Sequence, residues 1–197
     1  MAARTASKGI LPVLRTDAPD FEDRFEKLVR RRARSAGDVE KAVRKIVDRV
    51  RDGGDKDLVA CIRKFDGNKA ANLEVTKEEW DEGCDTIDPA DRAALGKAAM
   101  RVREFHRKRV PSSWEVREEG GGVFGHRVRP LERAGLYVPG GKAVYPSSVI
   151  MNAVPASVVE VPEIVMATPA DARGSLRPEI LMAARVAGVH RIFKMPA

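Results

Sequence analysis

A Pro-Gly-Gly turn at residues 139–141 carries the strongest chemical signal in this sequence. It follows a short apolar run, residues 136–138, and a second apolar run opens a few residues later at Ser147-Ser148. Two consecutive glycines leave backbone N–H groups unshielded, so a ligand can come close to the main chain. A helix beginning near Ser147 would direct its free amides and the serine hydroxyls toward an anionic group. The pattern indicates a site for a phosphate-bearing ligand, and a purely structural glycine turn is the alternative.

Two familiar nucleotide-binding motifs do not account for this turn. A Walker A loop would place a glycine where Leu136 stands, and a hydroxyl residue where Ala143 stands. The dinucleotide fingerprint G-x-G-x-x-G is also absent from the sequence. A phosphate-bearing ligand would therefore bind here by another arrangement.

The elements around the turn predict a parallel sheet. Strand-like runs at residues 136–138, 163–167 and 191–193 alternate with helical patterns at 147–158 and 178–187. This order is typical of a Rossmann-like unit, in which ligands bind outside the carboxyl ends of the strands. The Pro-Gly-Gly turn stands at that edge.

The sequence pattern predicts helices over about the first 110 residues. Capping residues stand at Asp20, Thr76 and Asp88, and Glu79 is expected to form a capping box with Thr76. Helix breaks are expected at residues 35–37 and 53–54. Residues 110–130 hold two short β-like runs separated by three glycines, which predicts a hairpin.

The fold class expected from these patterns is α/β. A helical N-terminal segment is followed by the start of a Rossmann-like parallel sheet, which is incomplete. We expect a helical segment at 1–35, part of a first α/β domain with long helices and a hairpin at 36–133, and the truncated beginning of an NAD-binding domain at 134–197.

Composition limits the function classes. The chain has 197 residues, of which 43% are hydrophobic and 33% charged, and it lacks both a membrane-spanning apolar run and a secretory signal. A cytoplasmic protein without membrane contact is expected. The net charge of +7 raises a nucleic-acid hypothesis, but the basic runs at 30–34 and 101–110 stand at predicted helix ends and lack interleaved aromatic residues. No nucleic-acid partner is expected.

The potential metal ligands are few and dispersed. Cys61 and Cys84 form no C-x-x-C pair, and the three histidines (106, 126 and 190) are scattered along the chain. The two cysteines are expected to be buried or half-buried side chains, and no metal site is expected in this chain.

Residues 130–158, PLERAGLYVPGGKAVYPSSVIMNAVPASV, resemble the signature segment of the histidinol dehydrogenase family. Residues 50–67 and 163–169 are similar to neighbouring family segments. The resemblance implies an NAD-dependent zinc alcohol dehydrogenase that oxidises L-histidinol to L-histidine, the last step of histidine biosynthesis. It implies a homodimer for the full-length family enzyme. It also implies that Tyr137 contacts NAD, together with Gly140 and Gly141.

The departures from the family pattern are equally informative. Family members are much longer, and the resemblance assigns their zinc ligands, their Glu-His general base and most substrate contacts to a C-terminal half. The chain ends in KMPA where the family has Gly-Gly-Ala-Gln, and Val159-Glu160 replaces the usual Ala-Gly. We therefore expect an N-terminal fragment that holds no catalytic or metal-binding residue and is inactive alone. The alternatives are another alcohol dehydrogenase of the same family and a non-catalytic truncated binding module.

Overall fold

The computed structural model describes residues 13–67, 72–140 and 143–195. The chain divides into two compact units, residues 1–57 and 58–197. The division expected from the sequence, at residues 35 and 133, remains a prediction. No helix in the described part of the chain is both long and apolar enough to cross a membrane.

Helix α1, Phe21–Asp66, differs from the expected series of short helices. It continues through residues 35–37, so the break predicted there is wrong. A single glycine inside a helix costs only about 1 kcal/mol, which good helix formers on either side can offset. The second expected break is present, because Gly54 adopts φ 60° and ψ −148°, a conformation essentially confined to glycine.

The second unit contains the expected parallel sheet. Strands β3 (Arg133–Tyr137), β4 (Glu163–Thr168) and β5 (Arg191–Lys194) pair in the order β3-β4-β5. Helix α4 (Pro146–Val158) connects β3 to β4, and helix α5 (Pro178–Ala187) connects β4 to β5. The predicted α/β class is confirmed, and each strand and helix predicted for this parallel sheet lies within a few residues of its expected bounds.

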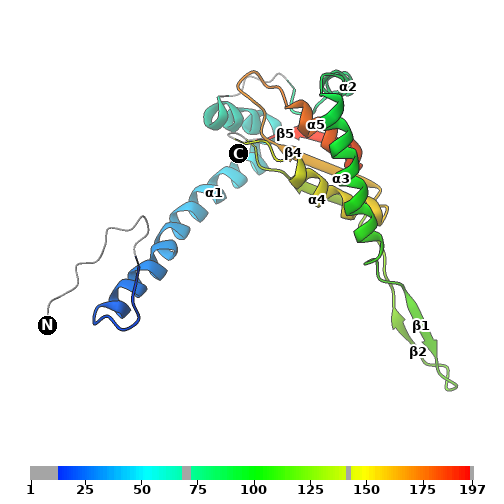
Figure 1. The fold of residues 1–197 in the computed structure, drawn as a ribbon, viewed down its shortest axis with the longest axis horizontal. Coiled ribbons are helices and arrows are strands. Elements are labelled where there is room, and N and C mark those ends of the chain that lie inside the picture. The colour runs from blue at the N-terminus through cyan, green and yellow to red at the C-terminus, as the bar shows by residue number, and fades with distance from the viewer. Residues whose placement is uncertain (1–12, 68–71, 141–142, 196–197) are drawn as a thin grey trace. The chain divides into compact units, whose positions relative to one another are not determined.

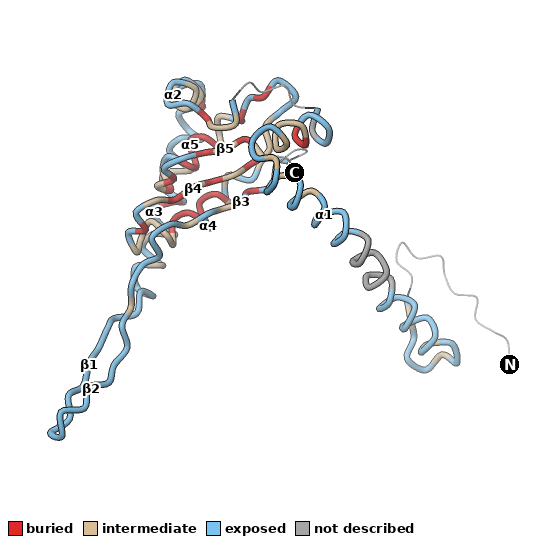
Figure 2. Tube along the Cα trace, turned by 180° about the vertical axis from the view of Figure 1, so that it is seen from behind, coloured by how far each residue is buried: buried red, intermediate tan, exposed pale blue. Residues whose placement is uncertain are grey.

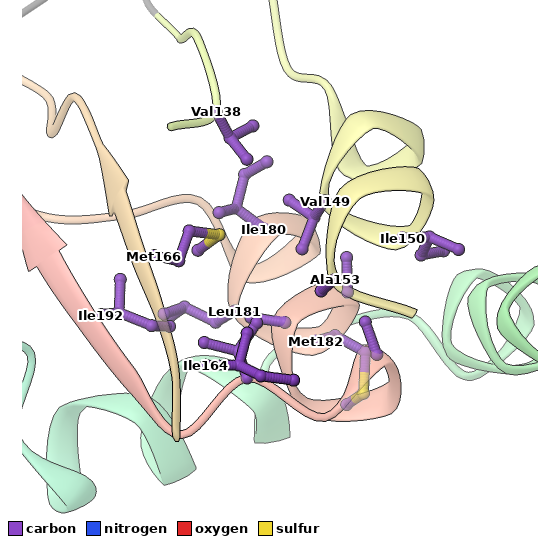
Figure 3. Packing of buried hydrophobic residues seen from close by; sticks show 14 of the residues in the cluster. Val138, Val149, Ile150, Ala153, Ile164, Met166, Ile180, Leu181, Met182 and Ile192 are labelled. Carbon is purple, nitrogen blue, oxygen red and sulfur yellow. The ribbon is translucent and has the colours of Figure 1, made fainter. Parts of the chain in front are cut away.

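One face of this sheet forms the core. The side chains of Ile164 and Met166 on β4 and of Ile192 on β5 are fully buried, whereas their neighbours along the strands are half-buried or exposed. Helices α4 and α5 cover this face with Val149, Ala153, Leu181 and other apolar residues (Figure 3). The two-residue period of a strand thus separates a core face from an outward face.

Helices α2 (Lys77–Asp85) and α3 (Pro89–Arg107) form a second layer behind α4 and α5. Their predicted caps are confirmed: the Thr76 hydroxyl accepts from the Glu79 amide at 3.2 Å, and the Asp88 carboxylate accepts from the Ala90 amide at 2.7 Å. The Trp80 indole N–H donates to the Leu181 carbonyl at 2.8 Å, which attaches α2 to α5.

The predicted hairpin consists of strands β1 (Trp114–Arg117) and β2 (Val123–His126), which pair antiparallel. It extends beyond α3, away from the parallel sheet, and is exposed along its length (Figures 1 and 2). Trp114 and Phe124 make an edge-to-face contact at 6.4 Å between ring centroids.

Helices α4 and α5 end in the same hydrogen-bonded motif with different residues. After α4, the Glu160 amide donates to the Ser157 carbonyl and the Val161 amide to the Ala156 carbonyl. After α5, Gly188 and Val189 make the equivalent two bonds. This is the Schellman motif, whose turning residue adopts a left-handed conformation that glycine favours. Glu160 has φ 58° and Gly188 has φ 87°. The turning residue after α4 is therefore a glutamate in a backbone conformation that is unfavourable for residues with a Cβ.

We expect Glu160→Gly to raise the free energy of unfolding by about 1 kcal/mol. The substitution removes the steric cost of a left-handed Cβ, and the greater freedom of glycine in the unfolded chain offsets part of this gain. Thermal and urea unfolding would measure the change.

Gly188→Ala provides the matched control in the same motif. Its Cβ would be strained and would lie 2.8 Å from the Ser157 hydroxyl oxygen, so this variant should be less stable than the parent. A Glu160→Gly variant that unfolds at lower urea concentration than the parent would contradict the strain assigned to Glu160.

A buried ion pair joins the end of β5 to α2. The Lys194 ammonium lies 2.8 Å from the Glu79 carboxylate, and the Lys194 side chain is only 8% exposed whereas that of Glu79 is 31% exposed. The Glu79 side chain therefore accepts from Lys194 and does not complete a reciprocal capping box at Thr76. Because a buried ammonium needs a partner, this contact fixes the end of β5 against α2.

Removing Glu79 and removing Lys194 should lower the free energy of unfolding by different amounts. Glu79→Ala leaves a buried ammonium unpaired and should destabilise the fold by about 2 kcal/mol or more. Lys194→Met leaves a carboxylate that water can reach and an apolar side chain of similar length, so we expect a loss below about 1 kcal/mol.

Urea unfolding of both variants, with Glu78→Ala at an exposed neighbouring site of α2 as control, would measure this difference. Equal losses for Glu79→Ala and Lys194→Met would contradict it.

An ionic network stabilises the opposite edge of the sheet. Arg191 on β5 donates two hydrogen bonds to Glu74, at 2.7 and 2.8 Å, and its third nitrogen lies 3.4 Å from Glu163. Arg133 on β3 bonds the other oxygen of Glu163. Hydrogen bonds from Arg191 lower the pKa of Glu74, and the hydrogen bond from Arg133 lowers the pKa of Glu163, although partial desolvation opposes both shifts. The network links all three parallel strands and the segment at Glu74.

This network should lose its contribution in acid. A carboxylate whose folded pKa lies below its ordinary value of 4.5 stabilises the fold above that value and loses its effect as the pH falls through the folded pKa. We expect Arg191→Gln to lower the melting temperature near neutral pH, and the difference from the parent to shrink from about pH 5 to about pH 3.

Arg117→Gln, which removes an ion pair on the hairpin, is the control and should show little difference at any pH. A difference between Arg191→Gln and the parent that is constant with pH would contradict the role of these carboxylates.

Candidate functional site

The carboxyl edge of the parallel sheet holds a cavity of about 280 Å³. Because β3 and β4 are adjacent and parallel, the loops that follow them lie side by side at this edge. The cavity is lined by residues of the turn after β3 and the start of α4 (139, 140 and 143–145), by the end of β4 and its following loop (168–171 and 175–177), and by Ile180 of α5.

Gly140, a predicted site residue, lines this cavity. A Cβ added at this position would lie 3.4 Å from the Pro169 ring and 3.6 Å from the Pro169 carbonyl oxygen, which are ordinary contacts. Its φ is not in the left-handed region. Neither the backbone conformation nor the described neighbours require glycine at position 140. Gly141, the second glycine, lies outside the described residues.

Tyr137, the third predicted site residue, occupies another face of the same edge. It ends β3 and is 50% exposed, and it is not among the residues that line the cavity. Successive residues of a strand point to opposite faces, so the buried Val138 faces the core while Tyr137 faces outward. The structure thus places Gly140 inside the cavity and Tyr137 on the outward side of the edge.

Both helices that follow the strands begin at the cavity. Helix α4 starts at Pro146, and Tyr145, the residue before it, lines the cavity without making a side-chain cap. The helix thus begins one residue before the expected start at Ser147. Proline is well suited to the first helical position, which explains why Pro146 is included. Helix α5 begins in the same way at Pro178, after Arg177. Two helix N-termini, with their partial positive charge, thus meet at one cavity.

The loop after β4 contributes residues that the sequence patterns did not single out. Asp171 lines the cavity, and its Oδ1 accepts hydrogen bonds from the amides of Arg173 at 2.9 Å and Ser175 at 2.8 Å. Arg177 also lines the cavity, and its guanidinium lies 3.8 Å from the Glu179 carboxylate. The Asp-x-x-Gly-Ser turn after a predicted strand is a signal that could have drawn attention to Asp171.

The described residues offer no metal centre and no activated thiol. They contain no group of three or more His, Cys, Asp or Glu side chains placed to hold a metal ion. The expectation that both cysteines are buried is confirmed for Cys61 and Cys84. Desolvation raises the pKa of the Cys84 thiol, which disfavours the nucleophilic thiolate.

Comparisons with known proteins identify similar proteins of one family. A family model described as histidinol dehydrogenase matches residues 29–196. A histidinol dehydrogenase of Clostridium acetobutylicum is 40% identical over 186 residues, which cover 94% of this chain and 43% of that protein. One from Carboxydothermus hydrogenoformans is 44% identical over 176 residues, covering 88% of this chain and 41% of that protein.

A solved structure shows the same fold. The crystal structure of histidinol dehydrogenase from Elizabethkingia anophelis superposes with a TM-score of 0.75 at 26% identity, covering 80% of this chain and 36% of that one. The chain spans about two fifths of the length of the curated relatives it matches. The family match over most of the chain, together with the shared fold, shows that this chain belongs to the histidinol dehydrogenase family, a family of oxidoreductases.

Proposed function

We propose that this chain supplies one wall of the NAD site of an enzyme that oxidises L-histidinol to L-histidine. The observation that carries the proposal is the cavity at the carboxyl edge, lined by Gly140 and by the starts of two helices. Ligands of open parallel sheets bind at this edge. Family membership supports the choice of an oxidoreductase cofactor over another phosphate-bearing ligand.

Several features of the cavity support the proposal of a dinucleotide ligand. The positive ends of the α4 and α5 helix dipoles and the Arg177 side chain would provide positive potential for the pyrophosphate group. Gly140 lets that group approach the main chain. When bound, NAD accepts the hydride that the alcohol loses. The part of this chain is to bind the cofactor and orient it.

Tyr137 would contact the same cofactor from the outward side of the edge. A tyrosine ring can stack on a planar group, and its hydroxyl can form a hydrogen bond to it. Because Tyr137 and Gly140 flank Val138 and Pro139, a ligand that reaches both has to lie across the edge of the sheet.

Zinc and the general base belong to another part of the proposed enzyme. The described residues do not fit a zinc site, so no step of the reaction is assigned to them. We propose that the residues for zinc, proton transfer and substrate come from family regions that this chain does not cover, and that the chain alone is inactive. A cytoplasmic location and a homodimeric full-length enzyme belong to the same proposal. Oxidation of a different small alcohol by the same machinery is the second possibility within the family.

Two substitutions test the cofactor wall. Gly140→Val would place a branched side chain in the cavity, and Tyr137→Ala would remove the ring. Each should weaken NAD binding by about 1–3 kcal/mol if contacts of stacking and hydrogen-bond strength are lost. NAD binding can be measured by NMR titration of the chain, which detects weak ligands.

The controls separate binding from folding. Phe124→Ala removes an exposed aromatic ring on the hairpin and should leave NAD binding unchanged. Tyr137→Phe separates the hydroxyl from the ring. If Gly140→Val and Tyr137→Ala both fold and titrate NAD like the parent, the turn is structural and the proposed site is wrong.

A further inference from the structure

We propose that His190 is a pH-sensitive clamp, which holds the start of β5 against β4 only while its imidazole ring is neutral. The clamp consists of two hydrogen bonds between His190, the residue before β5, and Ile164 on β4. Protonation of the ring releases the start of β5 from β4. The clamp lies at the amino edge of the parallel sheet, opposite the cavity, so the inference does not depend on the proposed cofactor site.

The first bond extends the sheet by one residue. The His190 amide donates to the Ile164 carbonyl at 2.8 Å, just ahead of the pairing between Val165 and Arg191 that begins the ladder. The second bond uses a side chain as acceptor, because the Ile164 amide donates to Nδ1 of the His190 ring at 2.9 Å. Ile164 is fully buried, so the ring satisfies a backbone donor beside the core.

The second bond fixes the protonation state of the ring. A backbone amide can only donate, so the ring nitrogen that faces it has to be an acceptor. His190 therefore carries its proton on Nε2, in a neutral tautomer. A proton on Nδ1 would face the Ile164 N–H group, so a charged imidazolium cannot make this bond. The clamp and the charged ring exclude each other.

The charged groups around His190 do not compensate a charge on the ring. The elements around it contribute Arg133 on β3, Glu163 on β4, Arg185 on α5, Arg191 on β5, Glu74, and Glu160 in the turn before β4. Glu74 and Glu163 are bonded to the arginines of the ionic network, and Arg185 is bonded to Asp81. Within the described ranges, no carboxylate lies within ion-pair distance of the His190 ring. An imidazolium would therefore lose the bond to Ile164 without gaining a salt bridge.

The clamp should respond to pH near neutrality. His190 is exposed, so protons reach its ring from the solvent. Histidine side chains change charge near pH 6.5 when nothing perturbs them, and about one pH unit lower only about a tenth of such rings are neutral. The carboxylates of the ionic network lose their charge only below their ordinary value of 4.5, so the two effects can be separated.

Hydrogen exchange of the Ile164 amide tests the clamp directly. We expect the protection of this amide, corrected for its intrinsic exchange rate, to fall about tenfold between about pH 7.5 and about pH 5.5. The amide of Met166, in the middle of β4, should keep its protection over the same range. Nitrogen chemical shifts of the His190 ring should show the proton on Nε2 at the higher pH.

His190→Asn is the matched variant. Asparagine places a carbonyl oxygen at the same point along the side chain as Nδ1, and this oxygen does not titrate. The variant should keep the Ile164 amide protected at both pH values, whereas His190→Ala should lack this protection at both. His126→Asn, at an exposed site of the hairpin, should behave like the parent.

Three results would overturn the inference. The first is a parent chain in which the Ile164 amide is equally protected at both pH values. The second is an equal loss of protection in His190→Asn, because this variant has no ring to protonate. The third is a proton on Nδ1 at the higher pH. If His190→Ala does not fold, the comparison between the parent and His190→Asn decides the question.

Discussion

The burial of one face of the parallel sheet is the constraint on which the second unit depends. Parallel strands cannot be joined by tight turns, so each connection crosses over through a helix, here α4 and α5. These helices bury Ile164, Met166 and Ile192 beneath them (Figure 3). Because the strands run in one direction, the crossovers all start at the same edge. The cavity between the β3 and β4 loops is a consequence of that geometry.

Local physical signals explain why so much of this fold could be predicted. The short apolar run that forms β4 and the glycine after α5 are each visible within ten residues of sequence. The caps at Thr76 and Asp88 are equally local, since a side chain bonds an amide two or three residues away. These features specify elements and their order without reference to the rest of the chain.

The features that were predicted wrongly or missed depend on small differences in energy, or on contacts between residues far apart in the sequence, which a local pattern does not contain. The α1 helix passes through residues 35–37 because the modest cost of Ser-Ala-Gly is smaller than the gain from continuing a long helix. The partner of Glu79 is Lys194, 115 residues away, and no local rule predicts that choice over a capping box. Asp171 and Arg177 join Gly140 only because two loops meet at one edge. The turn was predictable, but its opposite wall was not.

The alternation of side chains also constrains how any ligand uses this edge. Tyr137 points outward, Val138 is buried in the core, and Gly140 reaches the cavity on the helix side. The Pro-Gly turn thus leads the chain from one face of the sheet to the other within four residues. A compact anion could occupy the cavity alone, but a ligand that also touches Tyr137 has to be extended. The proposed recognition at both places would therefore require a long, two-part molecule such as a dinucleotide, with one part in the helix-bordered cavity and the other at the exposed ring.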